Sequence, residues 1–113
     1  MIVEKKETYS LISTKENSIQ VFYKSFEKQV DNFKNENLIL ELSNFINYKK
    51  EDFLLFLDIA QEKKNNGTSF VIVNAKANIE DFPEDFNIVP TIIEAEDILE
   101  MEAIERELSL IHI

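Results

Sequence analysis

The side chains that most often perform catalysis or bind metals are scarce in this sequence. It contains no cysteine, and its single histidine, His112, lies in the tail, where a metal ligand or general base would be poorly held. Neither a Ser-His-Asp nor a Cys-His arrangement can therefore be assembled. The single glycine, Gly67, also excludes a P-loop and a dinucleotide-binding motif, since both need several glycines. The sequence predicts a protein that is not an enzyme and that holds no metal or cofactor.

Acidic side chains, in contrast, are plentiful and unevenly distributed. Residues 1–76 carry 11 Lys and 11 Asp or Glu, whereas residues 77–113 carry 11 acids and the single base Arg106, so the net charge of −10 lies in the last third. This field disfavours nucleic acid as a partner. No pair of acids is flanked by apolar residues that would separate their pKa values for acid-base catalysis. The acidic third is either a solvated helix face or a docking surface for a basic partner.

The segment from Glu51 to Lys64 predicts an amphipathic helix with more apolar surface than one face needs. At about 100° per residue, one side of this helix carries Phe53, Phe56, Leu57 and Ala60. Leu55 and Ile59 fall on the opposite side and form a candidate exposed apolar pair. Either a loop or the tail of the chain covers this pair, or the pair contacts a partner or a second copy of the protein.

Two short apolar runs bracket this helix. Leu38–Leu42 precedes it, Phe70–Val73 follows it, and Asn65–Gly67 supplies a turn before the second run. Because parallel strands need a crossover connection of about a dozen residues or more, residues 37–74 predict a parallel βαβ unit. The uninterrupted Leu-Ile-Leu of the first run predicts a strand buried on both faces, as in the middle of a parallel sheet.

The first part of the chain adds further elements to this unit. Met1–Glu7 and Thr8–Thr14 predict strands, and a helix capped by Ser18 follows them. The apolar stripe of that helix consists of Ile19, Phe22, Phe26, Val30 and Phe33. After the βαβ unit, residues 75–87 predict a polar crossover with about one helical turn on each side of Pro83.

The end of the chain predicts a last strand and a closing helix. Pro90 in the strand Val89–Ile93 indicates an edge position or a strand beginning, because proline cannot donate to a ladder. The helix is expected over Glu94–Leu108, with Glu96, Glu100 and Glu107 facing out and a core stripe of Ile98, Met101, Ile104 and Leu108. The apolar tail Leu110–Ile113 either docks on the body or frays.

Length and composition predict one soluble domain. The 113 residues are 44% hydrophobic, which is enough for a core of their own. No run approaches the length of a membrane span, and the first residues lack the apolar segment of a signal peptide. The absence of cysteine excludes a disulfide framework. We therefore expect a cytoplasmic protein without membrane insertion.

In this order of elements the chain resembles the STAS domains, the family of anti-sigma-factor antagonists and of the cytoplasmic domains of sulfate transporters. Leu38–Ser43 is similar to the central "VVLDLS" strand of the family, and residues 53–67 are similar to its following helix and "RGG" turn. Ser69–Asn74 resembles the "LVLVN" strand, and residues 89–98 resemble the "FPIFDSLEEAL" ending. The resemblance covers most of the chain.

The resemblance implies an α/β fold in a single STAS-like domain over residues 1–113. Its sheet would be mixed but mostly parallel, with about four or five strands, and about four helices would accompany it. The implied order of elements is β-β-α-β-α-β-short α-β-α.

The functional signature of the family is missing. In the antagonists, a "DSSG" tetrad opens the helix after the central strand, and a partner kinase phosphorylates one of its serines. Ungapped alignment places Lys49, Lys50, Glu51 and Asp52 on these positions, which offers no hydroxyl for a phosphate switch. A register shifted by one residue would place either the fixed negative charge of Glu51 or the opposite charge of Lys50 at the phosphoserine position. The resemblance thus implies a diverged module that has lost the switch and keeps the surface for binding.

Three functions remain open, in this order. The first is a regulatory or scaffold module that binds a protein through the helix after the central strand, using Tyr48, Lys49, Lys50, Glu51, Asp52, Leu55 and Ile59. The second is a small self-associating structural protein, in which the apolar pair forms a symmetric homodimer contact. The third is a STAS-like domain that binds a lipid or nucleotide near the carboxyl ends of the strands, around Ser43–Asn47 and Asn74–Ala77.

Overall fold

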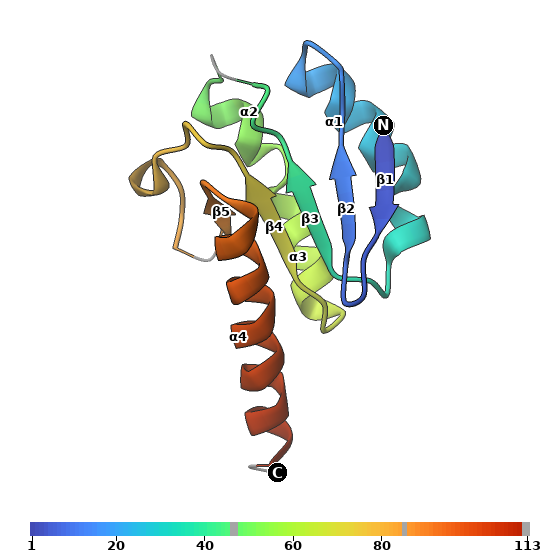
Figure 1. Ribbon diagram of the computed structural model, residues 1–113, viewed down its shortest axis with the longest axis vertical. Helices are drawn as coiled ribbons and strands as arrows, with labels where there is room; N and C mark the ends of the chain where they lie inside the picture. Colours follow the sequence, from blue (N-terminus) through green and yellow to red (C-terminus); the bar gives the residue numbers. More distant parts are fainter. Residues whose placement is uncertain (46–47, 85, 112–113) are drawn as a thin grey trace.

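Five strands form one sheet in the order in which they occur along the chain (Figure 1). The computed structural model describes residues 1–45, 48–84 and 86–111. The strands are β1 (Ile2–Lys5), β2 (Ser10–Ser13), β3 (Leu38–Glu41), β4 (Phe70–Val73) and β5 (Ile88–Val89). β1 pairs antiparallel with β2, while β2, β3, β4 and β5 pair parallel. The predicted α/β class with a mixed, mostly parallel sheet is therefore confirmed.

The central strands β3 and β4 are buried on both faces, as their uninterrupted apolar runs predict. Successive side chains of a strand point to opposite faces of the sheet. Leu38, Leu40 and Ile72 consequently belong to one apolar cluster, and Ile39 and Val71 belong to another. The sheet thus separates two cores.

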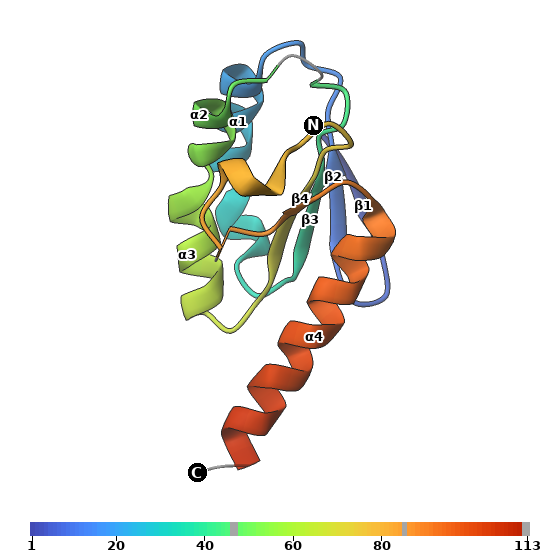
Figure 2. The same ribbon diagram turned by 90° about the vertical axis from the view of Figure 1, so that its left-hand side faces the viewer.

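The larger core lies beneath helices α1 (Ile19–Gln29), α2 (Lys50–Leu54) and α3 (Leu57–Asn65), which cover one face of the sheet (Figure 2). Ser18 caps α1 as predicted, because the backbone N–H of Val21 donates to Ser18 Oγ at 3.4 Å. A short 3-10 helix, η1 (Val30–Phe33), follows α1. Aromatic rings dominate this core, among them Phe22, Phe26, Phe53, Phe56 and Phe70.

The helix predicted after β3 is interrupted between α2 and α3. There the backbone N–H of Phe56 donates to the carbonyl of Phe53 at 3.0 Å, the bonding pattern of a tight 3-10 turn. Such a turn advances about 120° per residue, so α3 is rotated relative to one continuous helix. Ile59 is therefore buried, at 5% exposure, while Leu55 at the turn is 38% exposed. The prediction that Leu55 and Ile59 are both exposed is therefore wrong for Ile59 and confirmed for Leu55.

The opposite face of the sheet is covered by the long helix α4 (Ile92–Ile111), whose carboxyl-terminal half extends past the sheet (Figures 1 and 2). The strand predicted over Val89–Ile93 is wrong beyond Val89. The backbone N–H of Glu94 donates to Thr91 Oγ1 at 3.2 Å, so Thr91 acts as a cap and the next residues are already helical. Of the two positions indicated by Pro90, the edge of the sheet is confirmed, because β5 is the last strand; a strand beginning is wrong, since Pro90 follows Val89, the last residue of β5.

The core stripe predicted for α4 is confirmed for Ile98, which packs against the second core, and is wrong for Met101, Ile104 and Leu108. Over residues 92–108 of the helix, the buried side chains are Ala95 and Leu99, and Ile98 is half-buried. Met101, Ile104 and Leu108 are exposed by 59%, 50% and 50%. Glu100 and Glu107 are exposed as predicted; Glu96 is exposed too, but its carboxylate accepts a hydrogen bond from Tyr9 of the body.

The side of α4 that faces the sheet is therefore not the predicted one. Hydrogen bonds from the body account for this orientation of the helix about its axis. Three side-chain pairs join the helix to the sheet and its loops: Tyr9 to Glu96 at 2.7 Å, Asn87 to Glu102 at 2.8 Å and Arg106 to Ser69 at 3.2 Å. Each pair holds a polar residue of α4 toward the body. The apolar stripe on the other side of the helix is consequently turned to solvent.

The crossover from β4 to β5 contains the first of its two predicted helical turns. The 3-10 helix η2 (Ile79–Asp81) precedes Pro83, whereas residues 84, 86 and 87 form no helix. The expectation for the tail falls partly on His112 and Ile113, which lie outside the described residues.

Candidate functional site

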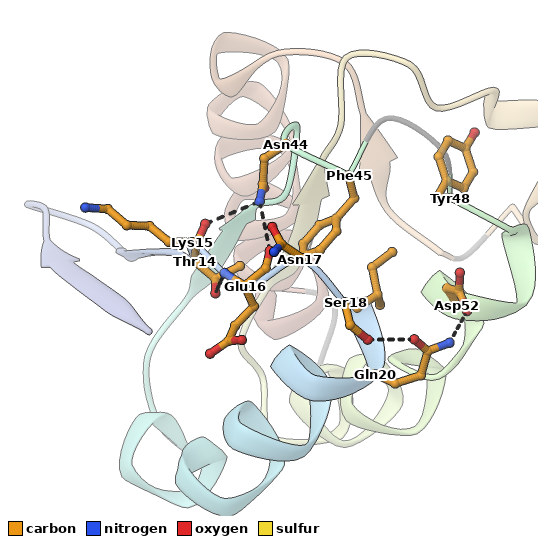
Figure 3. A pocket seen from close by; sticks show the side chains of 11 residues that line it. Thr14, Lys15, Glu16, Asn17, Ser18, Gln20, Asn44, Phe45, Tyr48 and Asp52 are labelled. Carbon is orange, nitrogen blue, oxygen red and sulfur yellow. Dashed lines mark hydrogen bonds between the residues drawn. The ribbon is translucent and has the colours of Figure 1, made fainter.

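A hollow of about 760 Å³ opens at the edge of the sheet where β2 and β3 end (Figure 3). Because these strands are parallel, the loops that follow them meet at this edge. The β2–α1 loop forms one wall, and the β3–α2 loop with the start of α2 forms the other. The lining residues are Thr14, Lys15, Glu16, Asn17, Ser18, Ile19, Gln20, Asn44, Phe45, Tyr48 and Asp52.

Asn44 ties the two loops together at one end of the hollow. Its Nδ2 donates to the carbonyl oxygens of Thr14 and Glu16, both at 3.4 Å (Figure 3). The backbone N–H of Glu16 in turn donates to Thr14 Oγ1 at 3.0 Å. Hydrogen bonds within the β2–α1 loop and across the hollow thereby join this loop to Asn44.

A second bridge joins α1 to α2 at the other end. Gln20 Nε2 donates to Asp52 Oδ1 at 2.6 Å, and Ser18 Oγ donates to Gln20 Oε1 at 3.0 Å (Figure 3). The other oxygen of Asp52, Oδ2, accepts from the backbone N–H of Lys49 at 3.2 Å. Asp52 therefore closes the first turn of α2 and braces the start of α1 at the same time.

Tyr48 connects this site to the loop after β4. Its hydroxyl donates to the carbonyl of Lys76 at 3.3 Å and accepts from the backbone N–H of Asn78 at 3.1 Å. Its ring packs on Phe53 with centroids 4.7 Å apart. These contacts fix the ring at the junction of the β3–α2 and β4–η2 loops.

Asn74 anchors the segment that carries Phe45, one of the residues that line the hollow. This buried side chain donates from Nδ2 to the carbonyls of Leu42, at 2.9 Å, and Phe45, at 3.1 Å. Its Oδ1 accepts from the backbone N–H of Lys76 at 2.9 Å. The loop that carries Phe45 is thus anchored to β4.

The structure brings together only part of the predicted sites. Of the partner-binding residues, Tyr48 and Asp52 line the hollow, Leu55 is exposed at the turn after α2, and Ile59 lies in the core. The others, Lys49, Lys50 and Glu51, are exposed at the start of α2.

The predicted ligand pocket is likewise found in part. From Ser43–Asn47, Asn44 and Phe45 line the hollow, whereas Ile46 and Asn47 lie outside the described residues. Residues 74–77 support the hollow without lining it. Sequence reasoning missed the wall formed by residues 14–20, which are the β2–α1 loop and the first two residues of α1. The signal for it was the polar run after the predicted strand Thr8–Thr14, which marks a ligand-facing loop only if that strand is parallel to its neighbour.

The charges at the hollow favour neutral polar groups. The charged residues that line the hollow are Lys15, Glu16 and Asp52, and the side-chain amides of Asn17 and Asn44 add donors and acceptors. The resulting balance of one excess negative charge disfavours phosphate. The arrangement suits hydrogen bonding to peptide groups or uncharged polar ligands.

Several groups with displaced pKa values lie elsewhere in the fold. Burial lowers the pKa of Lys63 to about 8 although Glu36 opposes the change, and a hydrogen bond from Lys5 lowers the pKa of Glu36 itself. Burial and a hydrogen bond to Glu96 raise the pKa of Tyr9 to about 12. None of these groups lines the hollow.

Across the residues described here, no three His, Cys, Asp or Glu side chains gather as a metal ion would require. No helix in that part of the chain is both long and apolar enough to cross a membrane. Comparison of the sequence with models of protein families and with curated proteins gives no significant match. The fold and the hollow are therefore the basis for a functional proposal.

Proposed function

We propose that this chain is a non-catalytic regulatory or scaffold module that binds a protein partner at the sheet edge where β2 and β3 end. The observation that carries the proposal is the hydrogen-bonded hollow between the β2–α1 loop and the start of α2. A braced polar surface of this kind pays little ordering entropy when it binds. The proposed contact residues are Tyr48, Lys49, Lys50, Glu51, Asp52 and Leu55, together with the β2–α1 loop.

We also propose that the domain is a diverged STAS-like module without a serine switch. The order of its strands and helices and its mostly parallel sheet support this relationship. The positions that match the phosphorylated tetrad lie at the start of α2, where Lys49, Lys50 and Glu51 are exposed and offer no hydroxyl. Binding there is consequently constitutive with respect to phosphorylation.

A second candidate is a small-ligand site in the same hollow. Its volume of about 760 Å³ falls in the range of small-molecule sites, roughly 300–1,000 Å³. The polar lining disfavours a lipid chain, and the excess of Glu16 and Asp52 over Lys15 disfavours a nucleotide phosphate. An uncharged polar ligand fits best. Self-association through the predicted apolar pair loses support, since Ile59 is buried.

The proposal is tested by capturing a partner from native lysate, purifying it and measuring its affinity directly. The variant Lys50→Glu/Leu55→Asp changes one charge and one apolar residue on the proposed surface. Val3→Asp/Lys24→Glu is the matched control, because Val3 is 39% exposed, close to the 38% of Leu55, and Lys24 is exposed.

We expect the surface variant to weaken binding at least about tenfold and the control variant to leave the affinity unchanged, with both folded by circular dichroism. Equal affinity of the two folded variants would contradict the proposed surface. Chemical shifts of the Asn17 and Asn44 side-chain amides, recorded with and without the partner, report whether the hollow itself is covered.

A further inference from the structure

Four exposed apolar residues form a stripe on the outer side of α4. They are Ile93, Met101, Ile104 and Leu108, exposed by 72%, 59%, 50% and 50%. At about 100° per residue they fall within roughly 80° of one another around the helix. The buried residues Ala95 and Leu99 lie on the roughly opposite side. We call this stripe the α4 seam.

The apolar residues of the α4 seam have the sequence spacing found in helices that pair with another helix. Met101, Ile104 and Leu108 follow the three- and four-residue steps of coiled-coil core positions, and Asp97 occupies the preceding position of the same series. The hydrogen bonds of Glu96, Glu102 and Arg106 to the body keep the seam turned outward. The half of α4 that carries most of the seam extends past the sheet, where a second helix has room to lie alongside (Figures 1 and 2).

Charge decides what kind of helix can pair there. The positions that flank the seam hold glutamates, Glu100, Glu105 and Glu107, and Asp97 lies within it. Flanking positions set partner choice in helix pairs. In a pair formed with a second copy, glutamate would face glutamate whether the helices ran parallel or antiparallel. Like charges at these positions oppose association, so the seam is poorly suited to self-pairing.

We propose that the α4 seam binds an amphipathic helix of a partner protein, one with large aliphatic residues along one face and Lys or Arg beside them. Such a helix covers the apolar stripe and places its cations against Glu100, Glu105 and Glu107. The acidic surroundings disfavour an anionic lipid surface in the same position. This site lies on the opposite face of the sheet from α2 and is independent of the hollow.

The test uses the full chain and synthetic helical peptides of about three heptads. The first peptide has Leu and Ile at its core positions and Lys at its flanking positions. A second peptide keeps the same core and carries Glu at the flanks. A third keeps the composition of the first but scrambles the apolar pattern. Fluorescence anisotropy measures the affinity, and sedimentation equilibrium measures the oligomeric state of the chain alone.

Variants locate the binding on the helix. Met101→Gln/Ile104→Gln/Leu108→Gln removes most of the seam without touching buried residues. Val3→Gln/Val21→Gln is the control, because these residues are exposed apolar side chains on β1 and α1. Circular dichroism checks that both variants are folded.

We expect a monomeric chain that binds the Lys peptide at micromolar concentration, more weakly as salt is raised. The seam variant should bind at least about tenfold more weakly, and the control variant should match the wild type. Equal binding of the scrambled or the Glu peptide, no binding of the Lys peptide, or unchanged binding by the seam variant would each overturn the proposal. A dimer that the seam variant dissociates would overturn it as well, in favour of a second copy as the occupant.

Discussion

Lys63 is a buried charge whose titration tests how α3 packs against η1. It is 3% exposed, and its Nζ donates to the carbonyl oxygens of Phe33, at 2.6 Å, and of Glu36. Burial lowers the pKa of Lys63 from 10.5 to about 8, while Glu36 acts in the opposite direction. A neutral amine retains two N–H groups, so it can still serve both carbonyls after it has lost its proton.

The free energy of unfolding is therefore expected to rise with pH between about 8 and 10.5. Below this window Lys63 is protonated in both states, and the folded chain bears the full penalty of the buried charge. Within the window the folded chain has lost the proton and the unfolded chain still binds it, so stability increases with pH. At about 1.4 kcal/mol per pH unit, the gain amounts to roughly 2 kcal/mol by about pH 9.5.

The titration of Tyr9 sets the upper pH limit for measuring the effect of Lys63 on the free energy of unfolding. Burial and its hydrogen bond to Glu96 raise the pKa of Tyr9 to about 12. Above about pH 10 the unfolded chain loses the tyrosine proton first, so this group lowers stability as the pH rises. Burial also raises the pKa of Tyr23, and measurements between about pH 7 and 9.5 keep the opposing contributions of both tyrosines small beside that of Lys63.

Urea unfolding followed by far-ultraviolet circular dichroism at several pH values measures the effect. Lys63→Met removes the titrating group and should abolish the rise, whereas Lys64→Met, at an exposed neighbouring position, should retain it. A wild-type stability that stays flat or falls between about pH 7.5 and 9.5 would refute the reasoning. It would mean that the two carbonyls and Glu36 hold the pKa of Lys63 near its ordinary value.

Two further predictions concern the sheet and the missing phosphate switch. Leu40→Ala removes a fully buried side chain from β3 and should lower the free energy of unfolding by roughly 2–5 kcal/mol; a loss below about 1 kcal/mol in urea unfolding would contradict the assigned core. Incubation with a serine kinase of the anti-sigma type should leave Ser43, whose Oγ accepts from the backbone N–H of Ala75 at 3.2 Å, without phosphate by intact-mass analysis. Stoichiometric phosphate on Ser43 would show that a switch persists.

The sheet was predictable because burial on both faces leaves a direct signal in the sequence. A strand in the middle of a parallel sheet is covered on both faces and favours apolar side chains on each, so Leu38–Leu40 and Phe70–Val73 are unbroken apolar runs. The N-cap Ser18 was predictable for a similar reason, since capping depends on residues close in sequence. Both the central strands and the N-cap can therefore be predicted from residue types over a few neighbouring positions, without knowledge of contacts between distant segments.

The rotation of α4 was not predictable in this way. An apolar stripe in a helix says that one side avoids water, but it does not say whether the sheet or another molecule covers that side. Here the small residue Ala95 and the polar anchors Glu102 and Arg106 face the body, through contacts with residues distant in sequence. Ile104 and Leu108 looked like core residues because their spacing alone cannot distinguish the two situations.

Only one of the two walls of the candidate site was predictable, because the position of the other wall depends on contacts between distant segments. The loop after β3 follows a strand that the sequence marks as parallel, so Asn44 and Phe45 fell within the expected pocket. The opposite wall, residues 14–20, follows β2, whose direction relative to β3 is set by pairing between distant segments. Ile59 was misplaced because the tight turn before α3 has no signature in the apolar pattern.

The two proposed surfaces differ in charge, and this difference separates them experimentally. The sequence through residue 76 has equal numbers of acids and bases and carries the hollow, whereas α4 belongs to the segment that holds the whole net charge of −10. Binding at the α4 seam should therefore weaken steeply as salt rises, while binding at the hollow should change little. Because α2 and α4 lie on opposite faces of the sheet (Figure 2), one partner does not cover the site of the other. A chain that holds two partners in this manner acts as a scaffold, and salt titration of each interaction distinguishes that role from a single docking surface.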